Sequence, residues 1–301
     1  MAISIDAIFQ GIFGINIIGI EKQHDARISG IFGDELILGS YLSRLFPLSF
    51  CALPLFLNKY VLNLKVKYLL SVFFILLIGS AIFFSGERTA FAIFFIVLFL
   101  LFLFVPANRL IVFYSCLLLI FSFLLISFLQ PNIQDRMIKL TIKNFEIGYE
   151  RYNRIIAFTE QHEAHYQVGL KMFNEKKLLG YGPKMFRKLC KNYDEFGCST
   201  HPHNSYIQLL AETGLIGFMI FFSLFCILIF SIARYYLFSR KIFDNQNQSN
   251  KIIILIAIFI SFFPLIPSGN FFGNWNNTVY YLPLGILIYL NFENNKTISN
   301  R

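Results

Sequence analysis

Long runs of apolar residues constrain this chain more than any other feature of its sequence. Runs able to cross about 30 Å of hydrocarbon, at about 1.5 Å of helix per residue, occur about seven times. They cover approximately residues 36–57, 68–84, 89–106, 109–130, 206–233, 252–268 and 275–291. Hydrophobic residues make up 56% of the 301, and the mean hydropathy is +0.61, far above that of soluble domains. We therefore predict an all-α polytopic integral membrane protein with about seven full transmembrane helices.

A shorter apolar stretch precedes these runs. It extends from Ala7 to Ile20 and is interrupted by Gln10 and three glycines, so we predict a partial or interfacial helix. The predicted organisation is an N-terminal partial helix and outer loop (1–35), four transmembrane helices (36–130), a helical loop domain (131–205), and three transmembrane helices with a short cytoplasmic tail (206–301).

The positions of the basic residues indicate what the net charge of +9 means. Ten of the 26 Lys and Arg residues lie in short connections and a C-terminal tail that share one side of the membrane if the spans alternate, whereas the short connections on the other side carry few. The ten are Lys59, Lys65, Lys67, Arg109, Arg234, Arg240, Lys241, Lys251, Lys296 and Arg301. By the positive-inside rule the side with these ten residues is cytoplasmic, and the long connection 131–205 is outside. The basic balance is therefore a sign of topology, and no nucleic-acid partner is expected.

The connection 131–205 is too long for a plain linker, so we expect it to fold and to carry function. It contains four of the five histidines and more Lys and Arg than Asp and Glu, which suits an anionic ligand at the membrane surface. Cys190 and Cys198 also lie here, and loop cysteines outside the cytoplasm favour a disulfide. The alternative is zinc, because the pairs His162/His165 and His201/His203 have suitable spacing.

The segment CSTHPHNSYIQ, Cys198–Gln208, places polar residues before an apolar helix. Pro202 cannot lie within a helix, and Ser205 with Gln208 has the form of a capping box, so the helix should begin near Ser205. His203 and Asn204 then lie at its N-terminus, where the helix dipole favours neutral imidazole and attracts anions. His203 is thus a candidate general base, with a loop or cap role as the alternative.

A helix from this point to Ala233 would be about 42 Å long, longer than the hydrocarbon is thick. We therefore expect its first turns, including Glu212, to stand in water. Gly214 and Gly217 are expected to let another helix pack closely.

SGERTAF, Ser85–Phe91, lies at a tight outer turn between two runs. Arginine at that depth is costly unless it is paired or functional. The guanidinium of Arg88 would suit phosphate oxygens. The alternatives are a salt bridge with Glu87 and a side chain that snorkels to the interface.

Together these segments resemble a known family. The spacing from His203-Asn204 through nine residues to GLIG, ending at Gly217, is similar to the signature of the bacterial O-antigen ligase and O-antigen polymerase superfamily. GLKMFNEKKLLGYGPKMF, from Gly169 to Phe186, resembles its outer-loop block, SGERTAF its arginine turn, and GIFGDELILGSYLSRL a block found upstream in some members.

The resemblance implies an inverting, metal-independent glycosyltransferase of the bacterial inner membrane with a periplasmic loop and no cofactor. Its donor would be an undecaprenyl-diphosphate-linked glycan. The acceptor would be lipid A-core for a ligase, or a growing lipid-linked O-antigen chain for a polymerase. His203 would deprotonate the acceptor hydroxyl, and Arg88, with Asn204, would bind the donor diphosphate.

Two features depart from the family pattern. Members often carry an arginine four residues before an aromatic, where this chain has His162 before Tyr166, so His162, His165 or Arg187 would supply the second cationic contact. Members also usually have more than seven spans, so we expect N-terminal helices to be missing. The rival function is a transporter or flippase of the same lipid-linked glycan. That rival would place polar groups near the membrane midplane.

Overall fold

The computed structural model describes residues 1–146, 159–239 and 246–299. These residues form helices, and no strand occurs among them apart from isolated β-bridges. The helices group into two compact units. Unit 1 comprises Met1–Thr141, Arg234–Ser261 and Leu282–Arg301, and unit 2 comprises Ile142–Ala233 and Phe262–Tyr281. The all-α prediction is confirmed for the described residues.

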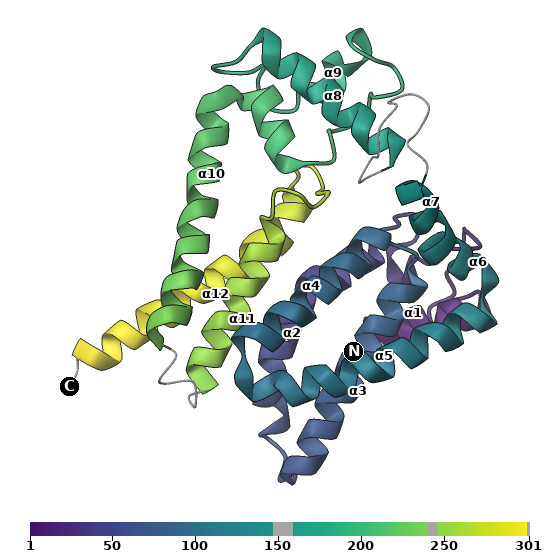
Figure 1. The fold of residues 1–301 in the computed structure, drawn as a ribbon, viewed down its shortest axis with the longest axis vertical. Coiled ribbons are helices and arrows are strands. Elements are labelled where there is room, and N and C mark those ends of the chain that lie inside the picture. Colours follow the sequence, from purple (N-terminus) through teal and green to yellow (C-terminus); the bar gives the residue numbers. More distant parts are fainter. Residues whose placement is uncertain (147–158, 240–245, 300–301) are drawn as a thin grey trace. The chain divides into compact units, whose positions relative to one another are not determined.

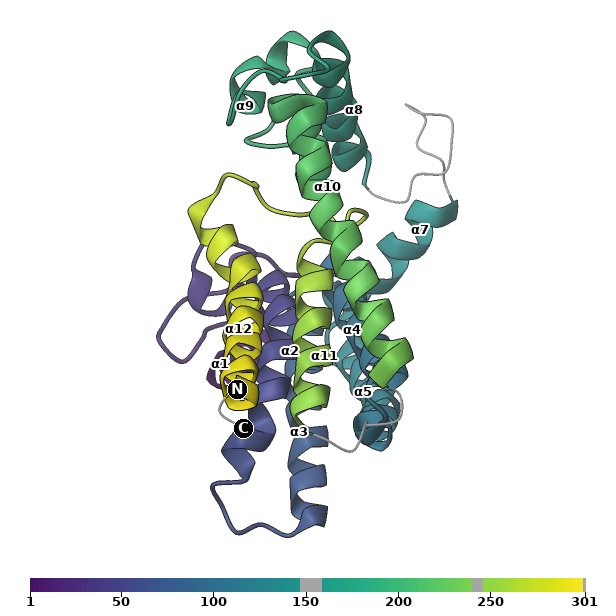
Figure 2. The same cartoon turned by 90° about the vertical axis from the view of Figure 1, so that its left-hand side faces the viewer.

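Unit 1 contains most of the helices (Figure 1). They are α1 (Ala2–Phe13), α2 (Leu38–Leu57), α3 (Leu64–Phe84), α4 (Arg88–Phe104), α5 (Arg109–Leu129), α6 (Pro131–Gln134) and α11 (Gln246–Ser261), with short helical turns η1 (Gly30–Phe32), η2 (Pro106–Asn108) and η3 (Asp135–Lys139). α2 packs beside α3, α4 and α11, and α3 packs beside α1 and α5 (Figures 1 and 2). Three further helices have residues in both units: α7 (Leu140–Glu146), α10 (Ser205–Ser239) and α12 (Asn274–Ser299).

Large apolar side chains fill the interior of unit 1. Phe46 of α2 and Phe94 of α4 are fully buried, and their ring centroids lie 4.9 Å apart in an edge-to-face arrangement. Gly79 of α3 leaves room for α5, because a Cβ there would lie 2.5 Å from Leu119 Cδ2. The close packing of α3 and α5 therefore depends on a residue without a side chain.

Four described helices are long and apolar enough to cross a membrane: Leu38–Leu57, Leu64–Phe84, Pro106–Leu129 and Ser205–Arg234. Ala2–Phe13, Arg88–Phe104 and Gln248–Ser261 are apolar but shorter. The membrane character is confirmed, whereas the count of about seven spans stays a prediction. The predicted end of the run 252–268 is wrong, because α11 ends at Ser261. Pro264 and Pro267 follow, and neither can continue a helix.

The N-terminal stretch forms a helix that is shorter than the apolar stretch predicted. α1 ends at Phe13, because Gly14 adopts a left-handed conformation (φ 80°) and donates its N–H to the Gln10 carbonyl at 2.9 Å. The following loop folds back on α1, since Ile17 N donates to the buried Asp6 carboxylate at 2.9 Å.

Unit 2 contains the histidine-bearing loop. Its helices are α8 (Glu160–Glu175), α9 (Phe186–Leu189), the turn η4 (Cys190–Asn192) and the first part of α10. Their shared core consists of Val168, Met172, Phe186, Cys190 and Ala211. This core brings α8, α9 and α10 together and so fixes the frame on which the histidines lie.

α10 is interrupted at Gly214, whose backbone is non-helical (φ 65°, ψ −164°). A Cβ at this position would lie 2.6 Å from Leu179 N and even closer to the Leu178 carbonyl. The prediction that this glycine admits another helix is therefore wrong, because a loop backbone occupies the space.

Several topology predictions stay predictions. Arg240, Lys241 and Arg301, and residues 147–158 of the predicted loop domain, lie outside the described residues. The domain boundaries at 35, 130 and 205 stay predictions as well. So does the side of the membrane that each connection faces.

Candidate functional site

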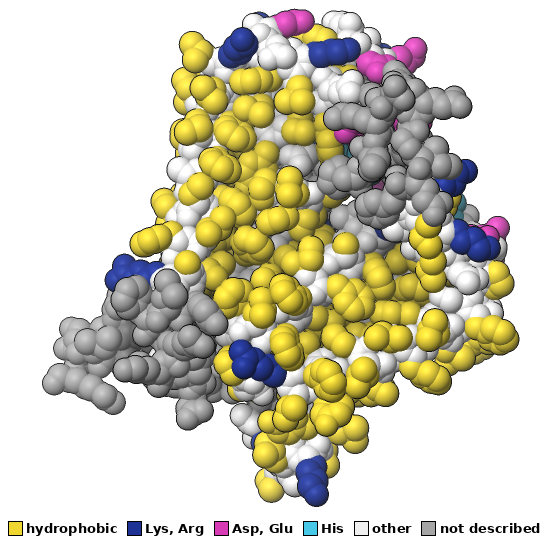
Figure 3. All heavy atoms as spheres, in the orientation of Figure 1, with side chains coloured by type: hydrophobic (Ala, Val, Ile, Leu, Met, Phe, Trp, Pro, Cys, Tyr) yellow, Lys and Arg dark blue, Asp and Glu magenta, His cyan; other side chains and the backbone are white. Residues whose placement is uncertain are grey.

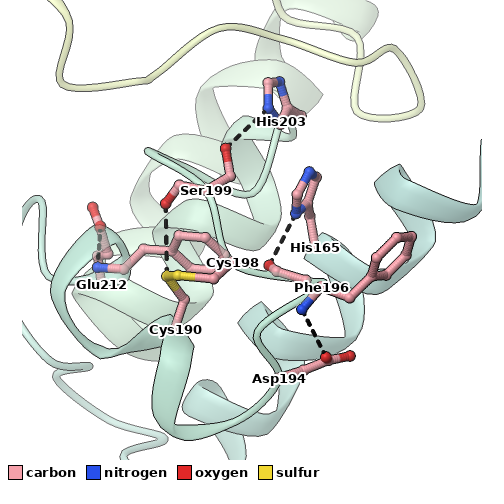
Figure 4. The surroundings of a disulfide bond; sticks show 10 residues. His165, Cys190, Asp194, Phe196, Cys198, Ser199, His203 and Glu212 are labelled. Carbon is pink, nitrogen blue, oxygen red and sulfur yellow. Dashed lines mark hydrogen bonds between the residues drawn. A yellow bond between two sulfur atoms is a disulfide. The ribbon is translucent and has the colours of Figure 1, made fainter.

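His203 lies in a short loop that ends at the start of α10. Its backbone is left-handed (φ 53°), a conformation unusual for a residue with a Cβ. Its carbonyl accepts a hydrogen bond from Ser268 N at 2.9 Å, and its ring Nε2 lies 3.3 Å from Ser199 Oγ (Figure 4). The loop therefore holds the imidazole by its backbone, and Ser199 is the hydrogen-bond partner of its ring among the described residues.

Asn204, rather than Ser205 or His203, caps α10. Asn204 Oδ1 accepts hydrogen bonds from Tyr206 N at 2.9 Å and Ile207 N at 3.1 Å. Its Nδ2 donates to the Pro264 carbonyl at 2.7 Å. The predicted start of the helix is right, but the predicted capping residue is wrong. Asn204 Oδ1 is occupied by these two capping bonds. The predicted binding of the donor diphosphate by Asn204 stays a prediction.

The side chains of the predicted capping box have other partners. Ser205 Oγ pairs with Ser268 Oγ at 2.8 Å. Gln208 donates to Asn270 Oδ1 at 2.8 Å and accepts from Phe271 N at 2.9 Å. These contacts join the start of α10 to the loop after α11, about 60 residues further along the chain. A local motif such as a capping box cannot predict partners from so distant a segment.

Four histidines from two segments of unit 2 lie around one another. The ring centroid of His203 is 5.1 Å from that of His165, 5.4 Å from His162 and 4.2 Å from His201. His165 is 2% exposed, and its Nδ1 lies 2.9 Å from the Gly197 carbonyl (Figure 4). Since a carbonyl only accepts, His165 Nδ1 carries the hydrogen.

The cluster disfavours protonation of its inner members. Burial, followed by the neighbouring imidazoles, lowers the pKa of His203 to about 3. Burial also lowers the pKa of His201 to about 4, and the charge of Arg187 contributes to that shift. Arg187 therefore lies near the cluster, on α9. At neutral pH, His203 is an uncharged imidazole that can accept a proton.

Among the described residues, no group of three or more His, Cys, Asp or Glu side chains is arranged to hold a metal ion. The structure joins Cys190 and Cys198, the pair indicated by the sequence, in a disulfide with a Cα–Cα distance of 4.9 Å. Cys190 is fully buried in the unit 2 core. The bridge anchors the chain one residue before Ser199, the partner of His203 (Figure 4).

Glu212 is a site residue whose role sequence reasoning missed. The expectation that it stands in water is wrong, because it is 1% exposed. Its carboxylate accepts hydrogen bonds from Lys184 N at 2.9 Å, Phe186 N at 2.8 Å and Gln208 Nε2 at 3.1 Å. It thereby ties the loop 180–186 to α10. The sequence signal that could have revealed this role is a carboxylate directly before a long apolar run.

In unit 1, Arg88 is the first residue of α4 and follows Glu87, whose carboxylate is partly buried. Glu87 accepts hydrogen bonds from Gly39 N at 2.7 Å, Ser40 N at 3.1 Å and Ser40 Oγ at 2.7 Å. Burial raises the pKa of Glu87. These bonds cap the N-terminus of α2, so Glu87 serves this helix. Its salt bridge with Arg88 and the snorkelling of Arg88 to the interface stay alternatives.

Two more arginines surround the same turn, and sequence reasoning missed both. Arg136 Nε donates to the Gly86 carbonyl at 2.8 Å, and Arg27 Nη2 donates to the Leu36 carbonyl at 2.9 Å. Gly86 is left-handed (φ 66°), and a Cβ there would lie 3.0 Å from Arg27 Cγ and 3.2 Å from Arg136 Cδ. Burial, then the charges of Arg27 and Arg88, lower the pKa of Arg136. The turn thus concentrates positive charge.

Comparison with known proteins bears on this geometry. A family model described as O-antigen ligase matches residues 72–222, half of the chain. The matched segment includes Arg88, all four clustered histidines and the disulfide. A search of the curated proteins finds no match. The resemblance inferred from the sequence motifs is confirmed by the family match, and the chain belongs to the O-antigen ligase and polymerase superfamily.

Proposed function

We propose that the chain is a metal-independent, inverting glycosyltransferase of the bacterial inner membrane, with its histidine loop in the periplasm and about seven spans. It moves glycan from an undecaprenyl diphosphate donor to an acceptor hydroxyl. The acceptor is lipid A-core for ligase activity or a growing O-antigen chain for polymerase activity. Family membership supports the reaction class, and the geometry of His203 supports the assignment of its base.

The neutral imidazole of His203 carries this proposal. In the reaction, the acceptor oxygen forms a bond to the anomeric carbon from the face opposite the diphosphate. The bond from that carbon to the diphosphate oxygen breaks, and its electron pair leaves with undecaprenyl diphosphate. His203 takes the hydroxyl proton as the acceptor attacks. No other co-reactant is needed for atoms and charges to balance.

Positive side chains stabilise the leaving diphosphate. Arg88 supplies a guanidinium fork that matches phosphate oxygens. Arg187, His162 and His165 are the candidates for the second contact, because they lie in or near the histidine cluster. A base with a pKa near 3 is weak by itself. The negative charge of a bound donor would raise the pKa of His203 and make it a better base in the complex.

The decisive variant is His203→Asn. Asparagine tolerates a left-handed backbone, so the substitution preserves the loop while it removes the imidazole. Because Asn204 caps α10, a cap role does not protect activity in this variant. We expect transfer by purified protein with lipid-linked donor to fall about 10²- to 10⁴-fold, with little change in donor affinity.

Lys184→Asn is a matched control, because Lys184 is the other described non-glycine residue with positive φ (63°). It should keep near-normal transfer. Arg88→Ala should weaken donor binding and turnover together, and Arg88→Lys should restore them only in part. Near-normal transfer by folded His203→Asn protein would end the general-base assignment. Supplying lipid A-core or lipid-linked glycan as acceptor distinguishes ligase from polymerase.

A further inference from the structure

The turn Lys176–Gly180, between α8 and α9, exposes two adjacent leucines. Leu178 is 65% exposed and Leu179 is 73% exposed, whereas the core residues Val168 and Met172 of the preceding helix α8 are fully buried. Lys176 and Lys177 directly precede them, and the Lys176 ammonium lies 4.4 Å from the centre of the Tyr181 ring. The turn therefore combines two lysines at its start with an apolar tip, a composition typical of membrane-surface segments.

The backbone of this turn is fixed to the interruption in α10. Leu215 N donates to the Lys177 carbonyl at 2.7 Å, and Ile216 N donates to the Leu178 carbonyl at 3.3 Å. Gly214 has no Cβ, which allows the two backbones to approach this closely. The two leucines are therefore held at one level of α10, the level of residues 214–216.

That level is where the exposed apolar surface of α10 begins. Glu212 and Gly214 are buried, whereas the apolar side chains that follow are 41–63% exposed: Leu215, Ile216, Met219 and Ile220. Figure 3 shows hydrophobic side chains gathered along this helix. From Leu215 to Ala233 the helix rises about 28 Å, close to the thickness of the hydrocarbon core of about 30 Å. Gly214 thus directly precedes a stretch of α10 whose length matches the thickness of the hydrocarbon core.

We propose that the turn Lys176–Gly180 inserts Leu178 and Leu179 into the edge of the bilayer and places Lys176 and Lys177 among lipid phosphates. The partner is the lipid bilayer, because the turn continues the exposed apolar surface of a membrane-spanning helix. The lysine stems cover apolar surface while their ammonium groups reach the headgroups. This contact sets the depth of unit 2 at the membrane, where the head of a lipid-linked substrate also lies.

Depth-dependent fluorescence quenching of the full chain tests this proposal without any transfer assay. The single tryptophan, Trp275, is replaced by phenylalanine. Leu179→Trp is then introduced, and the protein is reconstituted in vesicles of zwitterionic and anionic phospholipid. We expect lipids brominated on the acyl chain to quench this tryptophan strongly and aqueous iodide to quench it weakly.

Phe196→Trp is the matched control. Phe196 is 45% exposed and follows Asp194 and Glu195, whose charges disfavour lipid, so iodide should quench its replacement and brominated lipid should not. Strong iodide quenching of Leu179→Trp without lipid quenching would overturn the proposal.

A second measurement covers the case in which Trp275→Phe does not fold. Leu179→Cys and the exposed Lys171→Cys are treated with a membrane-impermeant maleimide in vesicles. The native free cysteines lie in the apolar helices α2, α5 and α10, and the parent protein gives their background. We expect Leu179→Cys to react at least tenfold more slowly than Lys171→Cys. Equal rates would refute membrane insertion of the turn.

Discussion

Replacing Glu212 tests how the loop 180–186 is held on α10. Glu212→Ala removes the acceptor of three hydrogen bonds, two of them from backbone N–H groups. Phe186 is fully buried, so its N–H has no access to water when the carboxylate is lost. A hydrogen bond to a charged group contributes about 1.5–3 kcal/mol, and an unsatisfied buried donor costs a similar amount.

The expected readout is hydrogen exchange at single amides. At about tenfold per 1.4 kcal/mol, the loss predicts exchange at Phe186 N roughly 10- to 150-fold faster in Glu212→Ala. Lys184 N is partly exposed, and water can replace its partner, so its exchange should change less. Glu212→Gln keeps one acceptor oxygen and should lie between the two extremes.

Glu175→Gln is the control, because this carboxylate is exposed and accepts from Tyr181 and Tyr193 instead. Its exchange at Phe186 should match the parent protein. If folded Glu212→Ala protein protects the Phe186 amide as well as the parent does, the carboxylate is not what holds the loop.

Two further predictions concern unit 2. Replacing both Cys190 and Cys198 by alanine should lower the free energy of unfolding by about 2.5 kcal/mol, since the bridge closes a short loop; an unchanged melting curve under non-reducing conditions would contradict this. The unfolded chain gains protons below pH 6.5 that folded His203, with a pKa of about 3, does not bind. Stability should therefore fall by up to about 1.4 kcal/mol per pH unit from 6.5 toward 5, and melting of His203→Asn across that range should show a shallower slope.

The sequence predicted what local patterns determine. Apolar runs predicted the helices, and Pro202 predicted where α10 begins. The spacing of His203, Asn204 and GLIG predicted the family. Each of these signals depends on residues within a few turns of one another, so composition and periodicity are sufficient.

The sequence did not predict contacts between distant segments. Ser268 lies 65 residues after His203, yet its N–H donates a hydrogen bond to the His203 carbonyl. Glu87 directly precedes Arg88, yet its carboxylate caps α2, whose N-terminus lies about 50 residues earlier. Such pairings depend on how helices pack, and a single sequence does not encode them as a local pattern.

Hydrogen bonds also distinguish side chains that stabilise the fold from side chains that are available for reaction. The oxygens of Asn204 and Glu212 each accept two backbone N–H bonds, so a substrate would have to break structure to use them. His203 differs, because its backbone is fixed through the carbonyl while its ring nitrogens serve no helix or loop backbone in the described structure. A general base needs this combination of a fixed position and an available lone pair. The same reasoning predicts that substitutions at Asn204 and Glu212 reduce activity through folding, whereas those at His203 reduce it through chemistry.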